Sequence, residues 1–94
     1  MIRVLIERRL ADEGGELLQQ SMKEMRTQAL HQPGYVSGET LRDTSDPLHY
    51  FTLSTWHSEE EWRAWFTSDA RRKIERRVGL LLNGPEKITV LEPA

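Results

Sequence analysis

The spacing of apolar residues switches along the chain between the period of a strand and that of a helix, and this order constrains the fold most. Residues 2–9 alternate and are rich in β-branched types, which is typical of a strand. A helix is expected next, from residue 16 to Pro33-Gly34, with Asp12 as its cap. The apolar residues that repeat at helical spacing are Leu18, Met22, Met25 and Ala29.

Two strands with a turn between them follow, and then two short helices. Residues 35–42 and 48–56 predict an antiparallel hairpin, because the connection at 43–47 consists of residues that favour turns. Ser58 and Glu61 have the spacing of a capping box, and Ser68 predicts a second helix start after an interruption. A last short strand is expected over 87–91.

This order, β-α-β-β-α-β, predicts an α+β, ferredoxin-like fold with a four-stranded antiparallel sheet. The length of 94 residues predicts one domain, residues 1–94. Apolar side chains are expected on both faces of the sheet, since Tyr50 and Trp56 point to one side and Phe51 and Leu53 to the other. The helices cover only one face, so we expect a homodimer that packs sheet against sheet.

Composition and charge exclude several function classes. The chain has no cysteine, so thiolate metal sites, disulfides and cysteine nucleophiles are excluded. A net charge of −2 favours no nucleic-acid partner, and the basic run from Arg71 to Arg77 reads as a solvated helix face. No membrane-spanning segment or secretory signal is evident, so a cytoplasmic protein is expected.

Histidines and tryptophans are the first candidates for chemistry, and each has two readings. His57 follows the third strand and is either a general base or an exposed loop residue. The histidine spacing favours no metal site. Trp56, Trp62 and Trp65 lie within ten residues, either as core or as an aromatic wall for a flat ligand.

Two carboxylates also have two readings. Glu7 shares a strand face with Arg3 and Leu5, and Glu75 lies at the edge of the apolar helix stripe. Either side chain projects into a cavity between sheet and helices, where burial would suit it to proton transfer, or forms a surface ion pair. For Glu75 the ion-pair partners would be Arg71 and Arg72.

Four segments together resemble the antibiotic biosynthesis monooxygenase family, over nearly the whole chain. They are Pro33-Gly34-Tyr35-Val36-Ser37-Gly38-Glu39-Thr40-Leu41, the run from Thr52 to Trp62, Ala64-Trp65 with Ser68, and Leu81-Leu82 before Pro85. The resemblance implies a dimeric α+β barrel of ferredoxin-like units. It also implies oxidation of small phenolic, quinol or polyketide-like aromatics by O2, without a metal, flavin or nicotinamide cofactor.

Under this resemblance the protein binds a flat aromatic ligand, assists its deprotonation and stabilises the anion. The residues expected to contact substrate are Tyr35, Trp56 and Trp65, and those expected to assist catalysis are Glu7, His57 and Glu75. The alternative is a non-catalytic dimeric module of the same fold, which binds a small molecule or serves in stress responses. An open cavity with an ionisable group inside favours the enzyme, and a filled one favours the module.

The sequence also resembles the haem-degrading branch of the same superfamily at one position, Trp65. The first-strand asparagine of that branch is replaced by Glu7, and the haem-ligating histidine by Glu75. A carboxylate is a poor substitute for the imidazole ligand, so haem degradation is disfavoured.

Overall fold

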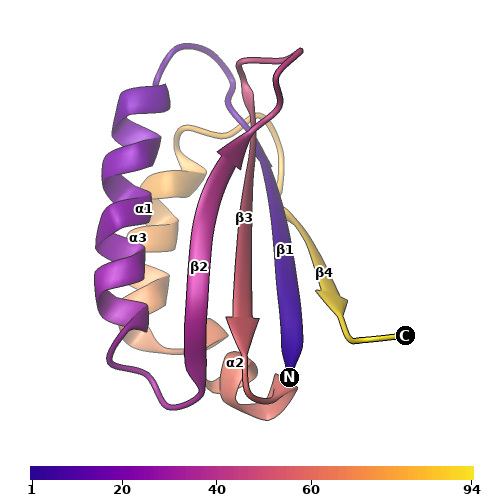
Figure 1. Ribbon diagram of the computed structural model, residues 1–94. Helices are drawn as coiled ribbons and strands as arrows, with labels where there is room; N and C mark the ends of the chain where they lie inside the picture. The colour runs from indigo at the N-terminus through magenta and orange to yellow at the C-terminus, as the bar shows by residue number, and fades with distance from the viewer.

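Seven elements make one antiparallel sheet with helices on a single face. The computed structural model describes all residues from 1 to 94 (Figure 1). The elements are β1 (Ile2–Arg9), α1 (Gly15–Ala29), β2 (Tyr35–Arg42), β3 (His49–Trp56), α2 (Glu59–Phe66), α3 (Asp69–Gly79) and β4 (Lys87–Leu91). None of the three helices has the length and apolar content needed to cross a membrane. The cytoplasmic location stays a prediction.

The strands lie in the order β2-β3-β1-β4, and all neighbours pair antiparallel. Helices α1 and α3 lie side by side on one face of the sheet, and α2 lies at the end of the sheet where β3 stops (Figure 1). This arrangement confirms the ferredoxin-like α+β fold expected from the sequence, with the second helical segment divided into α2 and α3.

Serine caps explain why that segment divides. The Ser58 side chain accepts a hydrogen bond from the Glu61 backbone N–H, and its hydroxyl donates to the Glu61 carboxylate at 2.9 Å. Ser68 caps α3 in the same way, accepting from the Arg71 backbone N–H. Each cap satisfies a backbone donor that a helix start leaves free, so the chain can begin a new helix at Ser68.

Two boundary predictions were wrong. Asp12 does not cap α1, because Gly14 is the N-cap, with φ of 140°, a conformation that side-chain-bearing residues rarely adopt. The third strand begins at His49 rather than Leu48, because the Leu48 backbone N–H donates to the Asp46 side chain in the preceding turn.

The helix-facing side of the sheet carries the core. In β1 the even-numbered residues Val4 and Ile6 are buried against the helices, and opposite them in β3 lie Ser54 and Thr52. Arg8 follows on the same side and is also buried, with 3% of its surface exposed. A charged side chain buried this deeply needs partners, and these define the site described below.

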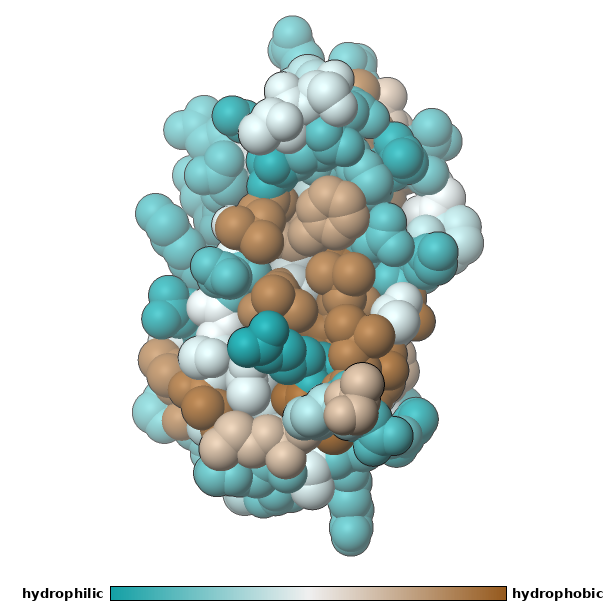
Figure 2. Space-filling model, turned by 45° about the vertical axis from the view of Figure 1, so that its right-hand side comes forward, coloured by the Kyte–Doolittle hydropathy of each residue, from teal (hydrophilic) through white to brown (hydrophobic).

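The opposite sheet face, which we call the open face, is covered by no element of the chain. Figure 2 looks onto this side and shows a hydrophobic patch over the middle of the sheet. Register places five apolar side chains on this face, namely Leu5, Leu41, Phe51, Leu53 and Leu91. The prediction that both faces are apolar is therefore confirmed, while the partner that would cover this one stays a prediction.

Candidate functional site

A cavity of about 490 Å³ opens between α1 and the β2 side of the sheet. Its floor is the helix-facing side of β3, its roof is α1, and α2 and α3 close its inner end. This volume lies within the range of ligand-binding cavities. The space between sheet and helices is therefore open rather than filled, which meets the first of the two conditions for the enzyme reading; the second is an ionisable group inside the cavity.

Aromatic rings form one wall of the cavity. The Trp56 and Trp65 rings lie nearly parallel, with centroids 6.5 Å apart, and the Tyr35 ring meets Trp56 edge-on at 5.2 Å. The Trp56 indole N–H donates to the Ser54 hydroxyl at 3.1 Å, which fixes its ring. All three aromatic residues named as substrate contacts line this cavity, so they are both core and cavity wall.

Gly38 leaves room for the Tyr35 hydroxyl, because it has no side chain. A Cβ atom at Gly38 would lie 2.7 Å from that oxygen, closer than van der Waals contact allows. Gly38 also lines the cavity. The glycine that weakens β2 as a strand thus makes room for a polar group at the cavity wall.

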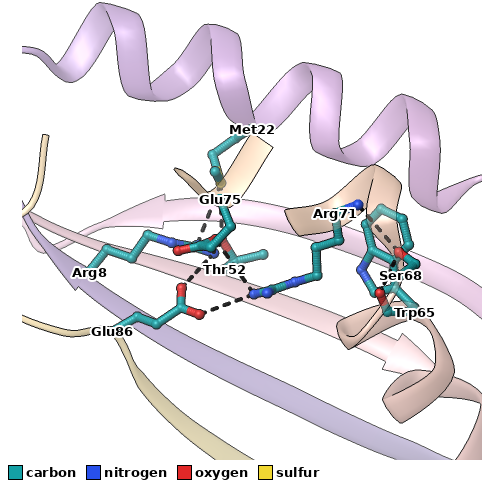
Figure 3. A network of polar contacts seen from close by, with 8 residues as sticks. All are labelled: Arg8, Met22, Thr52, Trp65, Ser68, Arg71, Glu75 and Glu86. Atoms are coloured by element: carbon teal, nitrogen blue, oxygen red, sulfur yellow. Dashed lines mark hydrogen bonds and ion pairs between the residues drawn. The ribbon is translucent and has the colours of Figure 1, made fainter. Parts of the chain in front are cut away.

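Two buried arginines line the inner end of the cavity, and neither was predicted from the sequence to contribute to the site. Arg8 extends from β1 and Arg71 from α3, and they reach the same two carboxylates from opposite sides (Figure 3). Each guanidinium Nη2 lies 3.1 Å from Glu86 and 3.6 Å from Glu75. We call these four residues the ion cluster.

The reading of Arg71 as part of a solvated helix face was wrong. Only 4% of Arg71 is exposed, and its guanidinium lies over the Phe66 ring at 4.3 Å. Position 71 is three residues before buried Ile74 and seven before buried Val78, so it belongs to the inner stripe of α3. Arg72 and Lys73 are exposed, as expected.

Glu75 lies behind the two arginines and does not line the cavity. Burial raises the pKa of the Glu75 carboxyl from 4.5 to about 7, although Arg8 opposes the shift; the neighbouring Glu86 adds to it. The expected ion pair with Arg71 is present, but it is largely buried rather than at the surface.

Glu7 and His57 lie outside the cavity. Glu7 is on the open face, because odd-numbered residues of β1 point away from the helices, so of its two readings the structure supports the ion pair and not the cavity. There its carboxylate lies 3.3 Å from the His49 ring and 3.9 Å from the Lys87 amine. His57 is exposed beyond the end of β3. Neither residue lines the cavity.

No cluster of potential metal ligands occurs in the structure. The fold and the cavity define the class: an α+β ferredoxin-like protein with an aromatic, ligand-sized cavity between its sheet and its helices. The chain belongs to the antibiotic biosynthesis monooxygenase family, whose model matches residues 1–77.

Solved structures with this fold are similar over nearly the full chain. A conserved protein from Methanosarcina mazei Go1 is 17% identical with a TM-score of 0.92, covering 99% of this chain and 92% of its own. SnoaB, a cofactor-independent oxygenase from Streptomyces nogalater, is 12% identical with a TM-score of 0.88, and the match covers 99% of this chain and 92% of SnoaB. Rv0793 from Mycobacterium tuberculosis is 18% identical with a TM-score of 0.87, and the match covers 99% of this chain and 94% of Rv0793. No curated protein matches the sequence significantly.

Proposed function

We propose that this protein is a cofactor-independent monooxygenase that oxidises a small phenolic, quinol or polyketide-like aromatic with O2. The observation that carries the proposal is the cavity of about 490 Å³, walled by stacked indole rings and lined at its inner end by Arg8 and Arg71. Family membership supports the reaction type, and the similarity to the fold of SnoaB is consistent with it.

In the proposed reaction the substrate supplies all the electrons. Loss of the phenolic proton gives an anion whose ring carbon attacks O2, forming a carbon–oxygen bond. The O–O bond then breaks as the C–H bond on that carbon is lost. One oxygen atom remains as a carbonyl, and the other leaves with both protons as water. The sum is phenol plus O2 giving quinone plus water.

The chain's own side chains bind and stabilise the anion. Trp56 and Trp65 hold the flat ring and exclude water from it. Arg8 and Arg71 stabilise negative charge on the substrate oxygen, since a buried guanidinium acts in a medium of low dielectric. Glu75 lies behind the two guanidinium groups, and its raised pKa of about 7 suits it to exchange a proton near neutral pH.

The proposal includes a homodimer formed through the open face. Leu41 and Leu91 are exposed there beside half-buried Phe51 and Leu53, and a large apolar patch on a monomer usually marks an interface. A second copy would bury this patch with two-fold symmetry.

One observation favours the non-catalytic alternative. The one carboxylate residue at the cavity is Glu39, which is exposed and pairs with Leu53 of the open face, whereas Glu75 lies behind two guanidinium groups. A cavity without a base in direct reach of the ligand suits binding better than turnover.

Oxygen uptake tests the proposed function. Chelator-treated protein is mixed with anthrone or with a panel of quinols, and O2 consumption is compared with protein-free autoxidation. We expect protein-dependent uptake that is lost in Trp65→Ala and largely kept in Trp65→Phe, which preserves an aromatic wall. Uptake equal to autoxidation for every substrate, with aromatic ligands still bound, would instead support the binding module.

A further inference from the structure

Positive charge gathers around the cavity in a chain whose net charge is −2. The basic residues that line it are Arg8, Lys23, Arg26, Arg42 and Arg71, against one acidic residue, Glu39. Three of the five, Lys23, Arg26 and Arg42, are exposed. These three residues, which we call the basic rim, raise the local concentration of anions by long-range attraction.

At the inner end, both buried arginines line the cavity. Arg8 Nη1 donates at 2.9 Å to the Thr52 hydroxyl and at 3.5 Å to the Met22 sulfur, and both of these residues line the cavity. The Arg8 Nε is enclosed by protein and has no partner. The Arg71 guanidinium forms its only hydrogen bond through Nη2, to Glu86, which leaves Nε and Nη1 without a hydrogen-bond partner. Guanidinium forks of this kind match the two oxygens of a carboxylate.

The ion cluster can change its net charge by one proton. Arg8 and Arg71 carry two positive charges, and Glu75 and Glu86 carry two negative charges when both are ionised. The charged groups that face Glu75 are Arg8 from β1, Arg71 from α3 and Glu86 before β4. A proton on Glu75 leaves the cluster with one net positive charge, which an anionic ligand can neutralise.

We propose that the cavity selects aromatic carboxylates: the ring lies against Trp56 and Trp65, the carboxylate binds Arg8 and Arg71, and Glu75 takes up a proton on binding. This inference names the substrate class of the proposed function and rests on that proposal only in treating the cavity as the substrate site. The basic rim guides the acid in, and the ion cluster holds it.

Calorimetry with a matched pair of ligands tests the selection. The probes are 1-hydroxy-2-naphthoate and its methyl ester, which share the ring and phenol and differ in charge. We expect the acid to bind at least about tenfold more tightly, as hydrogen bonds to charged groups allow. Equal affinity for acid and ester would overturn the proposal.

Proton uptake gives a second readout. At about pH 8 the binding enthalpy of the acid should vary between buffers of different ionisation enthalpy, showing uptake of up to one proton. Affinity for the acid should fall as pH rises through about 7, because Glu75 must then acquire a proton. Glu75→Gln should abolish the uptake and keep tight binding at about pH 8. Unchanged uptake in this variant would contradict the role of Glu75.

Variants of exposed residues avoid any loss of folding. The combined change Lys23→Gln, Arg26→Gln and Arg42→Gln should weaken binding of the acid and its salt dependence, but not binding of the ester. The control removes the same charge from the exposed α3 residues Arg72, Lys73 and Arg76, which do not line the cavity. Equal effects from both sets would overturn the steering role.

The outcomes separate this inference from the proposed function. Preference for the acid without any O2 uptake supports the ligand class and contradicts oxidation. O2 uptake with neutral quinols, together with no preference for the acid, supports oxidation and contradicts the ligand class.

Discussion

Arg8 and Arg71 are buried charges, and each requires compensating carboxylates close by. Each guanidinium is almost fully buried, and Glu75 and Glu86 compensate both. Removing one member of such a group costs more stability than the pair contributes, because the remaining charge stays buried without a partner. The ion cluster therefore links the cavity to the stability of the fold.

These arginines also show what sequence reasoning can and cannot find. Arg8 stands two residues beyond Ile6, on the buried face of the strand, and Arg71 lies on the α3 stripe. The burial of both positions could therefore be predicted from the spacing of the apolar residues. A charge is normally buried only when paired, and the partner Glu86 lies in the loop before β4, far away in sequence. Only the folded chain brings it close.

Glu75 makes the stability of the protein depend on pH. Its carboxyl has a higher pKa in the folded chain, about 7, than in the unfolded chain, so the folded state binds more protons between about pH 4.5 and 7. The stabilisation is complete below this window and is lost as pH rises through about 7. We expect a loss of about 1–2 kcal/mol, since solvent partly reaches the group.

Urea unfolding between pH 5 and pH 8 measures this effect in the wild type and in Glu75→Gln. The free energy of unfolding should fall with pH in the wild type and less steeply in the variant, whose amide does not titrate. Parallel curves for the two proteins would refute a raised pKa at Glu75.

Gly38 should control the size of the cavity. Gly38→Ala places a Cβ atom against the Tyr35 hydroxyl, so the ring must move toward the cavity. We expect about tenfold weaker binding of aromatic ligands with little loss of folding, because a shift of about 1.4 kcal/mol changes affinity tenfold. Calorimetric titration of the variant measures this. Gly79→Ala, at a helix position where nothing crowds a Cβ atom, is the control and should bind normally.

At the scale of elements, local signals predicted most of the boundaries. The bounds of β2 and β4, and the division between α2 and α3, follow from strand composition and from the serine caps. The start of α1 could not be predicted from Asp12, because Gly14 adopts a backbone conformation that places the cap two residues later. The packing of α1 decides where the cavity opens between the sheet and the helices. The spacing of apolar residues does not predict this packing.

The Ser58 cap should measurably stabilise α2, which carries Trp62 and Trp65. Ser58→Ala removes the acceptor for the Glu61 backbone N–H at 3.2 Å. We expect a loss of about 1 kcal/mol in the free energy of unfolding. Thermal and urea unfolding measure it. Ser21→Ala, inside α1, should be neutral or slightly stabilising, since alanine favours helix interiors. A neutral Ser58→Ala would show that packing alone fixes α2.

At the scale of the whole molecule, the open face predicts a dimer. Light scattering should give twice the chain mass of 11.0 kDa. Leu53→Asp places a charge in the apolar patch and should give the monomer mass, because a buried unpaired charge is costly. Leu80→Asp, at an exposed helix end, should leave the dimer intact. A wild-type mass near 11.0 kDa at micromolar concentration would contradict the dimer.

The aromatic cavity is proposed to promote the reaction of a phenolic substrate with O2. Mass spectrometry of the product formed from anthrone under ¹⁸O₂, with chelator-treated protein, tests it most directly. We expect anthraquinone carrying one ¹⁸O atom, formed by the wild type faster than without protein and by Trp65→Ala no faster than without protein. Formation at the protein-free rate, or product that carries only oxygen from water, would contradict it.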